Sequence, residues 1–407
     1  MMQPLKRCGS SLPETILDYE DILTEILVRV PARTLVRFKC VSKHWLSLIS
    51  NPNFCHLHTL RNPPHSSISA FFARTSNEFG LVPLDLDHGQ TSNSNCNPLN
   101  FGHNLYAIEI VQSCNGLFLC CPLPAEDSSF SATTTSKPLY YVLNPTTNQF
   151  STLTPPAAAA ATTGKPRVFG CALAFDPSKS PHYKVVFIWC VNEPIHAGWC
   201  PYHHIEIYSS ETRSWRLLDS SFDTQPQVRY EEGVYCNGAV HWVGTDCEMS
   251  YYHIDEERVG LVDGFPRSHE KNLYTRLSRY FRESHGGGHL HLIDIYGYSL
   301  TKFEVMEMGR DYSGWFVKYN VDLDPLCTTS PQILRAIFVL LTLAPEENEE
   351  DEESSSLLLH TPGKVISYNL RNKTFKSIDL TPKAGVDDSF CRIDLQNYRY
   401  VESLGVV

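Results

Sequence analysis

The sequence predicts a small all-α module of three helices over residues 20–62, followed by a large all-β domain over residues 66–400. Three observations predict this division. Apolar residues recur at helical spacing in the first segment, β-branched and aromatic runs fill the second, and one turn pattern repeats along it. Recurring hairpins favour an irregular β-propeller, which closes its sheet edges into a ring, with a twisted β-sandwich as the alternative. Residues 1–19 are expected to be a flexible tail.

The helical segment opens with apolar residues that fit one face of a helix, namely Ile22, Leu23, Ile26, Leu27 and Val30. Pro31 ends this helix and suits the first position of the next, where its missing N–H is not needed. Ser42 is expected to cap the third helix, and Asn51-Pro52 to end it. Three short helices bury little area alone, so the module is expected to need a partner.

The second segment carries the pattern of strands. Runs rich in β-branched and aromatic residues lie at 139–143, 184–189, 204–208 and 314–319. Asn115-Gly116 and Asn237-Gly238 predict tight hairpin turns, because glycine tolerates the positive φ that such turns require. The stretch around residues 273–281 is the exception, where a short helix is expected.

The turn repeat is the strongest sign of a closed β architecture. Residues 143–150, 208–215 and 368–375 share one layout, and residues 252–259 and 300–305 are weaker copies. In each, a strand ends, a polar turn follows and the return strand opens. Hairpins at these intervals predict blades, although the unequal repeats do not give their number.

Composition and charge exclude several classes of protein. With 42% hydrophobic and 11% aromatic residues the chain can pack a core. The apolar run at 336–344 is far short of the roughly 20 residues that span a bilayer, so no membrane association is expected. Residues 1–62 hold eight Lys/Arg against five Asp/Glu, whereas residues 63–407 hold 26 against 40. So acidic a β domain disfavours nucleic acid as its ligand.

The cysteines and histidines predict no metal or cofactor site. The 14 cysteines are scattered in apolar surroundings, which favours reduced, buried thiols in an intracellular protein. A cluster at Cys190, His196, Cys200, His203 and His204 matches no standard zinc spacing and is better explained as a polar loop. The glycine strip at 286–288 lacks the nucleophile elbow that an esterase needs.

The helical segment resembles an F-box. The matching stretch runs from Asp21 to Trp45 and continues through residues 48–54, while Asp18-Tyr19 stands where the usual opening Leu-Pro pair would be. The resemblance implies docking on a Skp-type adaptor and, through it, a cullin. The residues implied in adaptor binding are Ile22, Leu23, Ile26, Leu27, Pro31, Leu35, Val36, Cys40, Val41 and Trp45.

The β region is similar to the F-box-associated, kelch-like domain of plant F-box proteins. The matching pieces are residues 113–117, 144–147, 175–177, 183–186, 208–215 and 233–242. Together the two resemblances imply a non-catalytic receptor of a ubiquitin ligase, located in the cytoplasm or nucleus, that captures an unknown protein target. A non-ligase binding or assembly factor stays open as an alternative, as does a propeller lectin or enzyme.

Overall fold

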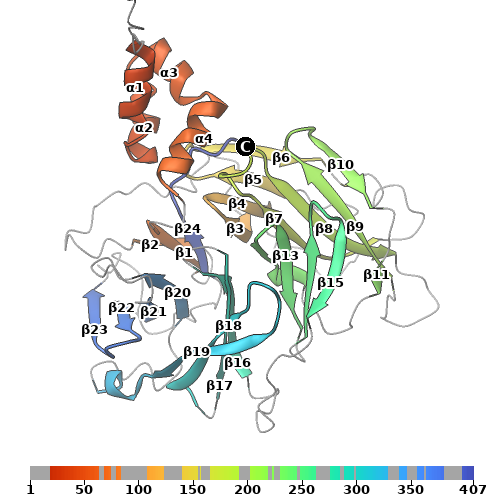
Figure 1. Cartoon of the computed structure of the whole chain (residues 1–407), viewed down its shortest axis with the longest axis vertical. Coiled ribbons are helices and arrows are strands. Elements are labelled where there is room, and N and C mark those ends of the chain that lie inside the picture. The colour runs from red at the N-terminus through yellow and green to blue at the C-terminus, as the bar shows by residue number, and fades with distance from the viewer. Residues whose placement is uncertain are drawn as a thin grey trace, which may run out of the picture.

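The computed structural model describes residues 19–63, 68–74, 79–83, 108–122, 140–154, 156, 166–191, 202–218, 222–223, 230–244, 248–262, 276–284, 288–297, 299–328, 339–345, 355–361, 364–379 and 397–407. These residues form a helical module at one edge of a large all-β domain (Figure 1). The expected tail at residues 1–18 lies outside the described residues. None of the described helices is long and apolar enough to cross a membrane.

The helical module contains one helix more than expected. Its helices are α1 (Tyr19–Leu27), α2 (Ala32–Phe38), α3 (Lys43–Ile49) and α4 (Pro52–Arg61). The Ser42 cap is confirmed, since its hydroxyl accepts the backbone N–H of Trp45 at 3.1 Å. Helix α3 ends at Ile49, just before Asn51-Pro52, as expected, but a fourth helix begins at the same pair: Asn51 caps α4 and Pro52 occupies its first turn, where proline costs no hydrogen bond.

The β domain is a propeller, as predicted. It has five blades. The first contains β3 (Ile108–Cys114), β4 (Leu117–Pro122), β5 (Tyr140–Asn144) and β6 (Gln149–Leu153), and the second contains β7 (Pro166–Ala174), β8 (Lys184–Val191), β9 (Tyr202–Ser209) and β10 (Ser214–Leu217). The third contains β12 (Val234–Cys236), β13 (Ala239–Val243), β14 (Met249–His253) and β15 (Arg258–Val262), the fourth contains β16 (Arg276–Glu283), β17 (Leu290–Tyr296), β18 (Lys302–Met308) and β19 (Trp315–Asp322), and the fifth contains β20 (Val339–Pro345), β21 (Ser355–Thr361), β22 (Lys364–Asn369) and β23 (Phe375–Asp379). Each is an antiparallel meander of consecutive strands, and β11 (Phe222–Asp223) adds to β9.

The two ends of the β domain meet in a further sheet. It has the order β2-β1-β24 and joins β1 (Ala70–Arg74) and β2 (Phe79–Pro83) to β24 (Asn397–Tyr400). Phe72 of β1 packs edge-on against Phe118 of the first blade at 5.3 Å and against Tyr400 of β24 at 5.8 Å. The ring is therefore closed by strands more than 300 residues apart in the chain.

The apolar cores of the propeller lie between neighbouring sheets. Five clusters of buried side chains each draw on two adjacent sheets; one joins Leu119 and Val142 of the first blade to Val185 and Phe187 of the second. Each fully buried side chain of this size contributes roughly 1.5–3 kcal/mol. Packing between blades, rather than within any one, thus holds the ring together.

The predicted turns are confirmed in conformation as well as place. Asn115 and Gly116 have φ of 45° and 88°, and Asn237 and Gly238 have φ of 50° and 84°. The sixth residue is also left-handed in four of the five copies of the turn repeat: Asn148, Arg213, Glu257 and Lys373 have φ between 51° and 59°. The fifth copy, residues 300–305, is not such a turn, because it runs into β18. The shared backbone conformation explains why the four turns share a polar layout.

Two local expectations are wrong. The short helix expected around residues 273–281 is replaced, over its described part, by β16, whose pairing with β17 outweighs its helical pattern. Eight described cysteines are free, as expected, but Cys190 is disulfide-bonded. His203 and His204 lie on β9, whereas His196 and Cys200 lie outside the described residues. No metal-binding group of His, Cys, Asp and Glu occurs in the described part of the chain.

Candidate functional site

Helix α1 carries two apolar stripes. Leu23 and Leu27 are 7% and 1% exposed and form the core of the helical module. Tyr19, Ile22 and Ile26 are 73%, 46% and 58% exposed. Their spacing of three and four residues aligns them along a single face, which we call the outer stripe. An exposed apolar stripe on a short amphipathic helix is typical of a surface that a partner covers.

The helical module is rich in exposed apolar side chains as a whole. Of the fifteen large hydrophobic residues exposed in the described part of the chain, seven belong to this module. Besides the outer stripe they are Val41, Leu46, Leu57 and Leu60. The propeller, several times larger, holds most of the others singly along its outer strands, so the helical module is the more strongly marked interaction surface.

The structure separates the expected adaptor-binding residues into two sets. Leu23, Leu27 and Leu35 are buried, and Val36 and Trp45 pack partly against the same core. Ile22, Ile26, Pro31, Cys40 and Val41 are exposed. Trp45 meets Phe38 edge-on at 5.6 Å. The exposed set is available for a direct contact, whereas the buried set shapes the helices that present it; the adaptor contact itself stays a prediction.

The last seven residues of the chain join the helical module to the propeller. We call residues 401–407 the C-terminal tail, and it passes between α4 and the first blade (Figure 1). Leu404 is 3% exposed and belongs to the core of the helical module. The Glu402 carboxylate accepts the backbone N–H of Arg33 at 3.1 Å. This satisfies a free amide in the first turn of α2, which Pro31 cannot cap.

The other side of the C-terminal tail is bound to the first blade. Buried Asn144 donates from Nδ2 to the carbonyls of Ser403 and Gly405, at 3.0 and 2.8 Å. The Ser403 N–H donates to Thr146 Oγ1 at 3.0 Å. A Cβ atom on Gly116 would lie 2.4 Å from that of Ser403, so only glycine permits the tail to pass this turn. A further link joins His56 of α4 to the Pro177 carbonyl at 3.0 Å.

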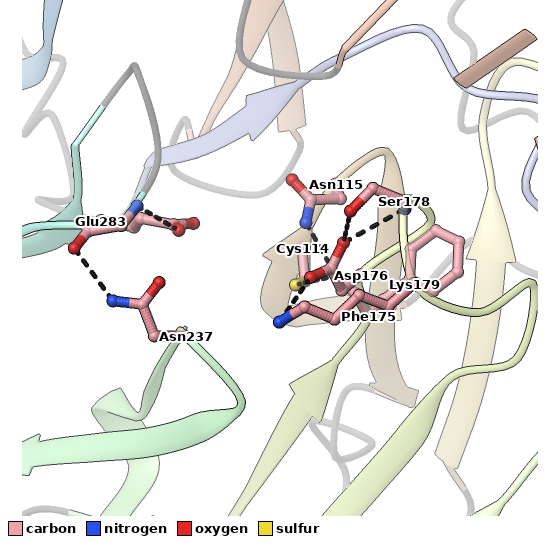
Figure 2. A network of polar contacts seen from close by, with 9 residues as sticks. Cys114, Asn115, Phe175, Asp176, Ser178, Lys179, Asn237 and Glu283 are labelled. Carbon is pink, nitrogen blue, oxygen red and sulfur yellow. Dashed lines mark hydrogen bonds and ion pairs between the residues drawn. The ribbon is translucent and has the colours of Figure 1, made fainter. Parts of the chain in front are cut away.

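A cavity of about 60 Å³ lies at the centre of the ring, where the innermost strands of several sheets meet. Its lining includes Cys114 and Asn115 from β3 and its turn, Tyr235 from β12, Arg282 and Glu283 from β16, and Arg399 from β24. Figure 2 shows Glu283 and Asn237 facing Cys114 and Asn115 across this centre. Residues from four sheets thus meet at one point.

Hydrogen bonds fix the polar groups around the central cavity. Arg282 Nη2 donates to the Asn397 carbonyl at 2.9 Å, and Arg399 Nη2 donates to the Glu283 carbonyl at 3.2 Å. Glu283 Oε1 accepts the Gly288 N–H at 3.2 Å. On the opposite side Asn115 Nδ2 donates to the Phe175 carbonyl at 2.7 Å (Figure 2). The cavity wall is therefore preorganised by bonds that cross between blades.

The Cys114 thiol in the cavity wall has low reactivity. Burial, reinforced by the negative charge of Glu283, raises the pKa of Cys114, and Arg399 only partly opposes this. The Cys114 thiol donates to the Phe175 carbonyl at 3.4 Å. A thiol held in its protonated form is a poor nucleophile. The arrangement therefore offers recognition groups rather than an activated nucleophile.

Neither the C-terminal tail nor the central cavity was foreseen from the sequence. The tail follows the expected β domain, and its contacts with Arg33 and Asn144 span hundreds of residues. The arginines of the cavity occur in ordinary strand contexts with no local motif. The one sequence signal was the Asn115-Gly116 turn, whose glycine makes room for the tail.

Comparisons with known proteins agree with both regions. The F-box domain family matches residues 19–57, and the family described as "F-box associated beta propeller domain" matches residues 71–283. The F-box protein At5g07610 of Arabidopsis thaliana is 33% identical over 98% of this chain and 94% of that protein. The F-box/kelch-repeat protein At3g17530 of Arabidopsis thaliana is 27% identical over 63% of each.

Solved structures share less with this chain. A prolyl endopeptidase matches 68% of this chain and 43% of its own, at 11% identity and a TM-score of 0.36, a similarity too loose to bear on function. The family matches instead agree with the helices and blades described above, and one relative extends over nearly the whole chain. This chain belongs to the family of F-box proteins that carry an F-box-associated β-propeller domain C-terminal to the F-box.

Proposed function

We propose that this protein is the substrate-recognition subunit of a Skp–cullin–F-box ubiquitin ligase. The F-box binds a Skp-type adaptor, and through it a cullin, while the propeller captures a protein target. The observation that carries the proposal is the outer stripe of α1, three exposed apolar residues on a helix of an F-box. Burying such side chains in a complex is worth roughly 1.5–3 kcal/mol each, less the cost of association.

The junction supports this role. A receptor must hold its target at a defined place relative to the ligase, and a flexible joint would spread the target over many positions. Here Leu404 packs in the F-box core, while Asn144 of the propeller hydrogen-bonds to the same C-terminal tail. We infer that the chain acts without catalysing a reaction itself, and that it does so in the cytoplasm or nucleus.

Co-expression with a Skp-type adaptor tests the proposal. A stable one-to-one complex on size exclusion, which then recruits the N-terminal part of a cullin, is the expected result. If a chain with folded helices and strands by circular dichroism binds no adaptor, the ligase role is wrong and a non-ligase binding protein is the better description.

A further inference from the structure

We propose that the cavity at the ring centre binds a carboxylate group presented by the target protein. The group is an acidic side chain or a free C-terminus. This inference rests on the proposed function, because it assumes that the propeller captures a protein. The central cavity would supply the charge-dependent part of target binding.

Two guanidinium groups from different sheets are brought together at this cavity. Arg282 is the penultimate residue of β16, the inner strand of the fourth blade, and Arg399 lies on β24, the strand that closes the ring. The two are locked by reciprocal bonds, each to a carbonyl of the other strand. Each bond uses one of the five N–H groups that a guanidinium carries, so donors remain for a ligand.

The cavity wall carries more positive than negative charge. The charged side chains that line it are Arg282, Arg399 and Glu283, two cations against one anion. In the described part of the chain, no carboxylate oxygen lies within 4.0 Å of a guanidinium nitrogen of either arginine, so neither forms an ion pair there. Beside Phe175, whose carbonyl holds Asn115, Asp176 and Lys179 pair with each other at 3.3 Å (Figure 2). One further negative charge would balance the centre.

Geometry also restricts where the Glu283 carboxylate acts. Its Oε1 accepts the Gly288 N–H, and Gly288 is held in turn by Asn237, whose Nδ2 donates to the Gly288 carbonyl at 2.9 Å. The Glu283 carboxylate is thereby held by its own hairpin. An incoming carboxylate finds charged donors, which give shorter and stronger hydrogen bonds than neutral ones.

The size of the cavity favours a single group over a whole small molecule. About 60 Å³ is room for only a few water molecules. Sites that enclose a cofactor or drug-sized ligand occupy about 300–1,000 Å³. A carboxylate at the end of a side chain or peptide fits, with the rest of the target lying on the surrounding turns.

The acidic net charge of the propeller does not contradict this assignment. Charges more than about 8 Å apart are largely screened at physiological salt, so contact with the two arginines dominates once the group has entered. The negative electrostatic field of the propeller instead disfavours the binding of densely acidic segments. The expected ligand is therefore an isolated carboxylate in an otherwise neutral or basic segment.

Peptide display tests the inference on the full chain bound to its adaptor. Libraries of random dodecamers are selected with free and with amidated C-termini. Enrichment of one Asp or Glu at a fixed position, or dependence on the free C-terminus, supports the proposal and tells the two sources apart. The matching peptide with Glu→Gln, or the amide, should bind at least about tenfold more weakly.

Variants connect the effect to the cavity. Arg282→Gln and Arg399→Gln should each remove most of the preference for the acidic peptide over its neutral match. Lys179→Gln, which removes a cation that does not line the cavity and is paired with Asp176, should leave that preference unchanged. Arg399→Lys keeps the charge and should retain part of it, which a purely structural loss would not show.

Two results overturn the inference. One is the absence of any enrichment of carboxylates over the input library. The other is an acidic preference that persists in both arginine variants while they remain folded. Adaptor capture by the same samples is scored separately, so that the cavity assignment can fail while the receptor function stands.

Discussion

A single histidine, His241, ties the third blade to the fourth. Its Nδ1 lies 3.2 Å from the Val234 carbonyl and its Nε2 lies 2.7 Å from the Tyr312 hydroxyl. Tyr312, in the β18–β19 turn, stacks on Tyr251 at a centroid distance of 4.6 Å. The side chain is 1% exposed, and this burial lowers the pKa of His241 to about 4, against the opposing hydrogen bond to Val234.

Buried neutral His241 predicts a loss of stability in mild acid. Its pKa is about 6.5 when unfolded and about 4 when folded, so the unfolded chain binds the proton more readily between these values. The free energy of unfolding should therefore fall as the pH drops from 6.5 to 4. This one group contributes about 3 kcal/mol at most.

The variant His241→Asn isolates that contribution. Its amide can still donate to the Val234 carbonyl but does not titrate, so its stability deficit relative to the wild type should shrink as the pH falls from 6.5 to 4. Urea unfolding at several pH values measures this. His44→Gln, at an exposed position on α3, serves as the control for replacing a histidine. A His241→Asn deficit independent of pH would contradict the account.

At the scale of elements, the outer hairpin of each blade turns on one strained residue. Lys373 has a φ of 59° at the sixth position of its turn, a conformation that costs a residue with a Cβ roughly 1–2 kcal/mol. Its side chain is exposed. Replacing Lys373 with glycine should therefore leave stability unchanged or raise it slightly, because the strain is relieved while no packing is lost.

A second lysine of the same hairpin provides the matched comparison. Lys376 is exposed too, but it lies within β23, paired with Ser367. Lys376→Gly should destabilise the propeller by about 0.5–1 kcal/mol, since glycine in a strand loses more entropy on folding. Opposite signs for the two substitutions in thermal unfolding are expected. Equal losses would show that the left-handed conformation of Lys373 carries no strain.

The elements that the sequence predicted correctly are those determined by local residues. The Asn-Gly turns and the Ser42 cap follow from one or two residues, and their conformations were predictable. Asn51-Pro52 correctly predicted the end of the third helix, but the start of α4 at the same pair was missed, because proline both ends and begins helices. The strand β16 was missed because its pairing with β17, not its own pattern, determines its conformation.

The features of the candidate sites that the sequence did not predict depend on long-range contacts. The apolar pattern of α1 was visible, but its division into a buried pair and an exposed outer stripe depends on how the four helices pack. The meeting of Arg282 with Arg399 requires a closed ring, since the two are far apart in the chain. No local signal in one sequence carries such information.

At the scale of the whole molecule, the C-terminal tail joins recognition to docking. Leu404 is buried in the F-box core, so Leu404→Asp would place an unpaired charge there, at a cost of several kcal/mol. Amides of α2 and α4 should then exchange hydrogen faster, while those of β16–β19, remote from the junction, should be unchanged.

Another tail residue controls for the added charge. Val406 is 42% exposed, and Val406→Asp should leave hydrogen exchange in the F-box as it is in the wild type. Mass spectrometry of the two variants decides between the alternatives. If Leu404→Asp protects α2 and α4 as well as the wild type does, the tail does not hold the F-box in place.

The most direct test of the central claim is the affinity of a Skp-type adaptor for variants of the outer stripe. Ile26→Asp, at a position 58% exposed, should preserve the F-box fold yet weaken adaptor binding at least about tenfold, because a charge would be buried in the contact. Leu261→Asp, at a position 60% exposed on β15 of the propeller, should bind like the wild type. Loss only in the Ile26 variant is the predicted result; equal binding by wild type and Ile26→Asp would contradict docking through the outer stripe.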